Sequence, residues 1–171
     1  QCTDVRVNVV TERLFNKYKT AKDYAGADLK TFEQEIKSTG FYKNKAKMII
    51  NAAKKLVSDF GGKIPSTMEE LTTLPGVGRK TASVVLSAGF NIPAIAVDTH
   101  VLRVSNRLGL VKSENPENVE MQLRKLIPED KWIDFSLAMI LHGRETCKAR
   151  KPLCNECILH KQCRWPEKTK G

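Results

Sequence analysis

Four of the five cysteines stand close together near the end of the sequence, and their spacing indicates one metal centre. They form a C-x6-C-x2-C-x5-C array and comprise Cys147, Cys154, Cys157 and Cys163. Thiolates are soft ligands, and four of them hold either a tetrahedral zinc ion or an iron-sulfur cluster. Zinc sites more often pair two C-x2-C motifs across a longer loop, so this array favours an iron-sulfur cluster. Disulfide bonds are the alternative, which an intracellular location disfavours.

A second motif lies in the middle of the chain, where Leu-Pro-Gly-Val-Gly-Arg-Lys-Thr-Ala occupies residues 74–82. It predicts a helix, a tight turn at Gly76 and Gly78, and a second helix, because glycine allows backbone positions that a Cβ would hinder. The N–H groups at the start of the second helix favour an anion such as a DNA phosphate, and Arg79 would reinforce that contact. A G-x-G turn alone is often an ordinary connection, but the whole string is far more specific.

The elements that must position these residues are helices. Apolar residues recur at helical spacing along the chain, and no convincing run of alternating strand residues interrupts them, so the predicted fold class is all-α. Helices are expected over residues 3–18, 28–38, 46–60, 79–88, 99–108, 116–127 and 131–141. The residues expected to cap helix N-termini are Asp28, Thr67, Asp98, Asn115 and Asp130.

The length of 171 residues allows one domain or two small ones. A Gly-Phe-Asn-Ile-Pro stretch at residues 89–93 breaks the helical pattern, and the chain beyond it carries the cysteine array. We therefore expect two domains. Residues 1–92 would contain the hairpin, at about residues 68–88, and residues 93–171 would contain the metal centre.

The charge balance favours a polyanionic partner. Lys and Arg outnumber Asp and Glu by 29 to 19, which gives a net charge of +10. Residues 142–171 alone hold eight Lys and Arg against three Asp and Glu, so the cysteine region is itself basic. A solvated charged surface explains this balance equally well. Neither a membrane-spanning stretch nor an export signal is apparent, so we expect a cytoplasmic protein, associated with the nucleoid if the source is prokaryotic.

Together these features resemble one family, the endonuclease III group of the helix-hairpin-helix DNA glycosylases. The resemblance is nearly chain-wide, and beyond the hairpin and the cysteines it rests on residues 1–4, 40–47, 96–100 and 141–144. It implies two helical domains, one around the hairpin and one holding a [4Fe-4S] cluster on the four cysteines. It also implies a monomer that binds damaged or abasic double-stranded DNA between the domains. Family members have further helices before the residue that matches Gln1.

The resemblance implies a bifunctional DNA glycosylase and AP lyase that removes oxidised pyrimidines in base excision repair. Lys80 matches the family's nucleophile, which attacks C1′ of a flipped nucleotide, expels the base and forms an imine that undergoes β-elimination. Asp98 matches the aspartate that assists by proton transfer or by stabilising positive charge on the sugar. The amine must be uncharged to react, and both burial and the positive end of the following helix would favour that form.

Several DNA contacts are implied in the same way. Flipping a base costs a few kcal/mol, which is offset by filling the gap that the base leaves. The residues that match the gap-filling pair are Gln1 and Phe41, although the family usually has leucine at the second position. His100 and His142 are expected to make structural hydrogen bonds. Phosphate contacts are expected from the loop between the first two cysteines, at Lys148, Arg150 and Lys151.

Two other functions fit parts of the sequence. A related monofunctional mismatch glycosylase shares the hairpin and the cluster, but those relatives usually lack a lysine at the position of Lys80. A non-catalytic DNA-binding module would use the hairpin and the cysteine loop only to hold phosphates. In that case Lys80 is a phosphate contact, and Asp98 is a plain helix N-cap, a role that can also coexist with catalysis.

Overall fold

The computed structural model describes residues 2–168, and all regular secondary structure in that range is helical. The predicted all-α fold class is therefore confirmed. Contacts between Cα atoms divide the chain into two compact units, Gln1–Gly78 (unit 1) and Arg79–Gly171 (unit 2). This division falls earlier than the boundary expected after residue 92. No helix in the described range combines the length and the apolar character needed to cross a lipid bilayer.

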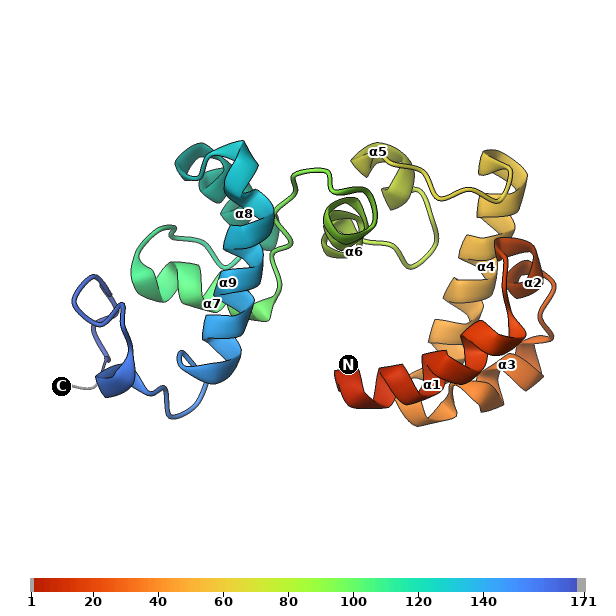
Figure 1. Ribbon diagram of the computed structural model, residues 1–171, viewed down its shortest axis with the longest axis horizontal. Helices are drawn as coiled ribbons and strands as arrows, with labels where there is room; N and C mark the ends of the chain where they lie inside the picture. The colour runs from red at the N-terminus through yellow and green to blue at the C-terminus, as the bar shows by residue number, and fades with distance from the viewer. Residues whose placement is uncertain (1, 169–171) are drawn as a thin grey trace. The chain divides into compact units, whose positions relative to one another are not determined.

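Unit 1 is built around one long helix. Its helices are α1 (Asp4–Lys17), α2 (Ala21–Ala25), α3 (Leu29–Glu35), α4 (Tyr42–Phe60) and α5 (Met68–Thr72), with a 3-10 turn η1 (Lys37–Thr39). The long helix α4 packs against both α2 and α3 (Figure 1). The core of the unit consists of Val10, Leu14, Tyr18, Phe32, Ile36, Ala46 and Ile50.

Short polar side chains begin most of these helices, since each accepts a hydrogen bond from a backbone N–H that has no partner inside the helix. Asp28 caps α3 and Thr67 caps α5, which confirms both predictions. The sequence analysis did not anticipate α2, which begins at a full capping box formed by Thr20 and Asp23. Hydrogen bonds from Thr20 hold the pKa of Asp23 below its usual value.

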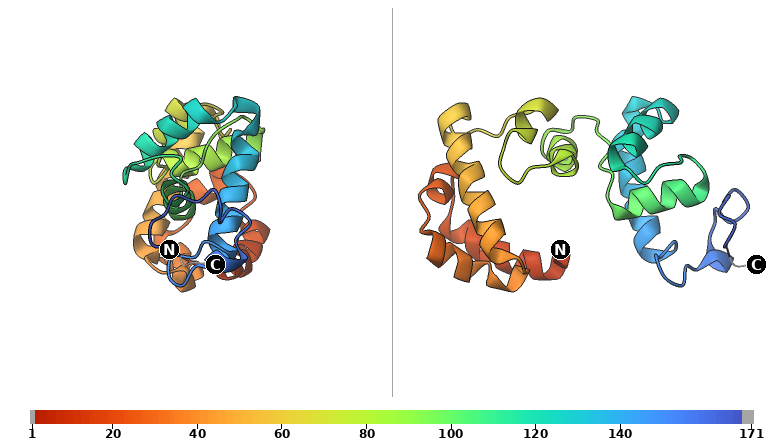
Figure 2. Two further views of the ribbon diagram at one scale, coloured as in Figure 1. Left: turned by 90° about the vertical axis from the view of Figure 1, so that its left-hand side faces the viewer. Right: turned by 180° about the vertical axis from the view of Figure 1, so that it is seen from behind.

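Unit 2 contains the remaining helices. They are α6 (Arg79–Val84), α7 (Thr99–Leu108), α8 (Pro116–Leu126) and α9 (Trp132–Glu145), with 3-10 turns η3 (Glu129–Lys131) and η4 (Cys154–Glu156). Helices α7 and α9 pack against each other (Figure 2). Gly143 permits this close approach, because a Cβ at that position would lie 2.9 Å from the Cβ of His100. The core consists of Ile95, Val97, Val101, Val104, Val111, Val119, Leu123, Trp132 and Met139.

Two predicted details of unit 2 differ from the structure. The helix expected over residues 79–88 ends as α-helix at Val84 and continues as a π-helical turn, η2 (Val85–Gly89). The predicted cap at Asp130 is wrong, because this residue lies within η3, which runs directly into α9 without a side-chain cap. Asp98 and Asn115 do cap α7 and α8, as predicted.

Ser105 on α7 leads to a stability prediction. Its side chain is fully buried, and its hydroxyl has no hydrogen-bond partner among the described residues. A buried hydroxyl without a partner costs about 1–3 kcal/mol, so Ser105→Ala should raise the free energy of unfolding by about 1 kcal/mol in urea denaturation. The matched control is Ser136→Ala, because the Ser136 hydroxyl donates to the Trp132 carbonyl at 2.8 Å. Equal effects of the two substitutions would contradict the prediction.

Candidate active site and cysteine pocket

Lys80 is the second residue of α6 and directly follows the glycine turn. The residue is exposed, and within residues 2–168 its ammonium makes no hydrogen bond or ion pair. The expectation that burial favours the uncharged amine is therefore wrong.

A pocket borders Lys80 within unit 2. The pocket is lined by three groups of residues: Arg79, Lys80 and Ser83 from α6; Ile95 and Val97 from the segment before α7; and Pro116, Glu117 and Glu120 from α8. Because Val97 directly precedes Asp98, the segment that carries the candidate aspartate borders the same pocket as the candidate nucleophile. The structure thus brings together two parts of unit 2 that the sequence singled out separately.

Asp98 uses only one of its carboxylate oxygens to cap α7. Oδ1 accepts hydrogen bonds from the backbone N–H groups of His100 and Val101, both at 2.8 Å. Within the part of the chain that the structure describes, Oδ2 accepts no hydrogen bond. Capping and proton transfer can therefore coexist in this side chain, since they require different oxygens.

The glycine turn before α6 has one position where glycine is required. Gly76 has a φ of 78°, and a Cβ at this residue would lie 2.8 Å from the Cβ of Met48 on α4. Both its backbone conformation and its contact with α4 exclude larger residues. Gly78 has open space around the position of a Cβ, so packing within the described residues does not require glycine there.

Arg79 has a protein partner that the sequence analysis missed. Its guanidinium donates to both carboxylate oxygens of Glu120, from Nε to Oε2 at 2.6 Å and from Nη2 to Oε1 at 2.8 Å. The expected phosphate contact must be reconsidered, because both bonds face the protein. The pair also ties α6 to α8. The only sequence signal for Glu120 was its place beside Val119 and Leu123 on the buried face of a helix.

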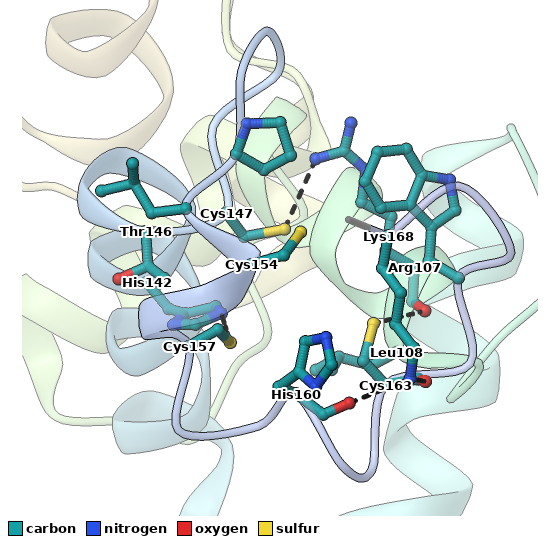
Figure 3. A pocket seen from close by; sticks show the side chains of 13 residues that line it. Arg107, Leu108, His142, Thr146, Cys147, Cys154, Cys157, His160, Cys163 and Lys168 are labelled. Carbon is teal, nitrogen blue, oxygen red and sulfur yellow. Dashed lines mark hydrogen bonds between the residues drawn. The ribbon is translucent and has the colours of Figure 1, made fainter. Parts of the chain in front are cut away.

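The four cysteines of the array line a single pocket (Figure 3). All four are free thiols, so the disulfide alternative is not seen. The side chains do not converge on one point, because residues 2–168 contain no group of three or more His, Cys, Asp or Glu side chains arranged around a single ion. The donor set is nevertheless that of a thiolate-bound centre, with four sulfur ligands around one pocket.

Arg107 of α7 links this pocket to the basic loop. Its Nη1 donates to the sulfur of Cys147 at 3.5 Å and to the carbonyl of Lys148 at 2.7 Å, and its Nη2 donates to the carbonyl of Ala149 at 3.2 Å. The guanidinium also stacks on the ring of Trp165, 3.9 Å from the centroid. One side chain therefore holds both the first cysteine and the start of the loop. The sequence analysis did not identify Arg107.

Both histidines singled out in the sequence make hydrogen bonds, as expected. The Nε2 of His142 lies 3.7 Å from the sulfur of Cys157, and burial lowers the pKa of this imidazole. The Nδ1 of His100 lies 3.2 Å from a guanidinium nitrogen of Arg103. Arg103 in turn donates to the backbone carbonyl of Cys147 at 3.0 Å, which connects α7 to the cysteine region.

The other candidate DNA contacts are exposed where they are described. Phe41 immediately precedes α4 with a left-handed φ of 48°, and its side chain is exposed, with the residue at 73%. Gln1 lies outside the described residues. The three basic residues of the loop are also exposed, namely Lys148, Arg150 and Lys151.

Comparisons with known proteins agree with the fold and the motifs. Residues 1–129 match the HhH-GPD superfamily of base excision DNA repair proteins. Endonuclease III of Synechocystis sp. is 54% identical over 164 residues, which cover 95% of this chain and 75% of that protein. Endonuclease III of Escherichia coli K12 is 42% identical over 168 residues, which cover 98% of this chain and 80% of that protein.

Solved structures show the same relationship. A trapped endonuclease III–DNA covalent intermediate in an estranged-adenine complex matches with a TM-score of 0.92 and 48% identity, covering 96% of this chain and 78% of that one. A thermostable thymine-DNA glycosylase matches with a TM-score of 0.87 and 28% identity, covering 98% and 79%. With a family match over most of its length and relatives of this similarity, the chain belongs to the endonuclease III family of the HhH-GPD superfamily.

Proposed function

We propose that Lys80 is the nucleophile with which this chain removes oxidised pyrimidines from double-stranded DNA. As a member of the endonuclease III family, the chain is a bifunctional DNA glycosylase and AP lyase of base excision repair. The observation that carries the assignment is the amine of Lys80, which has no partner within residues 2–168, follows the glycine turn and borders the pocket beside the Asp98 segment. A covalent endonuclease III–DNA intermediate needs such a nucleophile, and a lysine amine forms an imine with a sugar carbon.

The proposed reaction assigns one task to each side chain. The Lys80 nitrogen bonds to C1′ of the flipped nucleotide as the bond from C1′ to the base breaks, and the base leaves with a proton. The bond from C1′ to the ring oxygen O4′ then breaks as O4′ takes up a proton, and a protonated imine forms between the Lys80 nitrogen and C1′. Loss of a proton from C2′ then breaks the bond from C3′ to the 3′ phosphate. Asp98 would hold or transfer a proton at Oδ2, while Oδ1 keeps α7 capped.

We propose that exposed residues of both units hold the DNA. The backbone N–H groups of Gly76 and Gly78 would donate hydrogen bonds to a phosphate, and other phosphates would pair with Lys148, Arg150 and Lys151. Phe41 would enter the gap left by the flipped nucleotide, together with Gln1. In support, Phe41 is an exposed aromatic side chain on a left-handed backbone, a conformation that costs about 1–3 kcal/mol and occurs mainly at functional sites.

We further propose that the four cysteines bind a [4Fe-4S] cluster. Four free thiols border one pocket, and the Arg107 guanidinium lies within hydrogen-bonding distance of the Cys147 sulfur. Hydrogen bonds to the sulfur ligands are a common feature of such clusters. When bound, the cluster would cross-link the thiolates and so brace the basic loop between Cys147 and Cys154.

This proposal predicts the metal content of the protein. Protein purified without oxygen should contain about four iron atoms and about four acid-labile sulfides per chain. Cys157→Ser should lose most of the iron, since it removes one of four ligands. Cys2→Ser is the control and should keep the wild-type content, because Cys2 is remote in sequence from the array. Stoichiometric zinc in place of iron would overturn the cluster assignment.

The lyase assignment is tested by borohydride reduction in the presence of DNA with one abasic site. Reduction should trap a covalent complex, because borohydride converts the imine into a stable amine. Release of a mismatched base without trapping would favour the monofunctional glycosylase instead. DNA binding with neither base release nor trapping would favour the non-catalytic module.

A further inference from the structure

We propose that Arg79 and Glu120 form a positioning pair for Lys80. In this pair Glu120 holds the first turn of α6, and Arg79 keeps the carboxylate of Glu120 from pairing with the Lys80 amine. The proposal rests on the proposed nucleophilic role of Lys80. It assigns no contact with DNA to either member of the pair.

The geometry of the pair leaves little freedom to either side chain. The Glu120 side chain is only 6% exposed, and each of its oxygens accepts one hydrogen bond from Arg79, at 2.6 and 2.8 Å. A second guanidinium, that of Arg124, lies 3.5 Å from Oε1 and stacks on the ring of Trp132. A buried carboxylate that loses its partner is strongly unfavourable, so Glu120 holds Arg79 in place.

Holding Arg79 orients Lys80, because the two are consecutive residues in the first turn of α6. The helix direction and its rotation about its own axis decide where the next side chain leaves the backbone. The pair fixes both at the N-terminal end of α6. A displacement of about 1 Å in a reacting group can cost about a hundredfold in rate, so such a tie matters for a nucleophile.

Two arginines, and not Lys80, bind the buried carboxylate of Glu120. The charged side chains that line the pocket with Lys80 are Arg79, Glu117 and Glu120. An amine held by a carboxylate keeps its proton and cannot attack carbon. Arg79 occupies both oxygens of Glu120, and the Lys80 ammonium has no ion-pair partner within residues 2–168. Lys80 and Glu120 thus line the same pocket without an ion pair between them.

The test compares Arg79→Gln, Glu120→Gln and the double variant. For each, the single-turnover rate of borohydride trapping is measured against pH, and non-covalent affinity is measured with DNA carrying a tetrahydrofuran abasic analogue. Arg79→Gln should slow trapping at neutral pH by about ten- to a hundredfold and move its pH profile to higher pH, because Glu120 then pairs with Lys80. Adding Glu120→Gln should restore the profile and part of the rate. Lys125→Gln is the control for loss of a positive charge on α8 and should stay within about twofold of wild type.

A phosphate contact by Arg79 would give a different result. If Arg79→Gln weakens binding to the analogue while the trapping rate of the bound complex and its pH profile stay unchanged, Arg79 is a phosphate contact and the inference is overturned. Should Arg79→Gln fail to fold, Glu120→Gln and the double variant carry the test, since neither buries an unpaired carboxylate. An alkaline shift of the profile in either of these would overturn the inference.

Failure of the proposed function would look different. If trapping persists in Lys80→Ala, Lys80 is not the nucleophile, and the proposed positioning role of Arg79 and Glu120 is overturned as well. If trapping requires Lys80 but does not change in the Arg79 and Glu120 variants, only the positioning role is overturned.

Discussion

Lys80→Ala is expected to reduce borohydride trapping on abasic-site DNA by at least about a thousandfold, because it removes the only atom proposed to bond to C1′. The substitution should leave the fold intact, since the side chain is exposed and its ammonium has no partner among the described residues. Affinity for DNA with an unreactive abasic analogue should fall by no more than a few fold. Loss of trapping without a comparable loss of DNA affinity is the result expected for a nucleophile.

Lys125→Ala serves as the control for loss of a positive charge. Lys125 is exposed near the end of α8, and it has no assigned role in binding or chemistry. This variant should trap at nearly the wild-type rate. If Lys80→Ala instead loses affinity and trapping in equal proportion, Lys80 is a phosphate contact and the nucleophile must be sought elsewhere.

Asp98→Asn is expected to retain the fold and to lose about a hundred- to ten-thousandfold in the rate of base release. Asparagine caps helices as well as aspartate does, so its side-chain oxygen can keep the two hydrogen bonds that Oδ1 now accepts. Its amide group cannot take up a proton or offset positive charge at the place of Oδ2. The free energy of unfolding and the single-turnover rate should therefore respond differently.

Asp98→Ala completes this comparison, because it removes the cap as well. It should lose about 1 kcal/mol of stability in addition to the activity. A residue that only caps α7 would behave in the reverse manner, with Asp98→Asn nearly as active as wild type. That outcome would remove Asp98 from the proposed reaction.

The sequence predicted local structure well because its signals are local. Caps at Asp28, Thr67, Asp98 and Asn115 were visible since each side chain bonds a backbone N–H two or three residues away. The same kind of signal was present for α2 and was overlooked, because its five residues are too few to show a helical period. Asp130 failed for a related reason: a short 3-10 turn can take the place of a cap.

Features that depend on distant parts of the chain escaped prediction. Glu120 follows Arg79 by forty-one positions, and the helical pattern around Glu120 does not specify which arginine it binds. No sequence pattern indicated the role of Arg107, although it contacts the first cysteine and the loop beyond it. The exposure of Lys80 also depends on how the surrounding elements pack. The cysteine spacing predicted one metal centre, and the structure brings the four thiols to one pocket.

Helix α4 fixes the spacing between two parts of unit 1. It begins immediately after Phe41, and at Met48 it lies against Gly76 of the glycine turn. Seven residues of α-helix separate these two positions along the axis by about 10 Å. The proposed gap-filling side chain and the proposed phosphate-binding turn are therefore set at a fixed interval by one rigid element. In the proposed complex, α4 would therefore keep Phe41 and the phosphate-binding turn at one fixed spacing along the DNA.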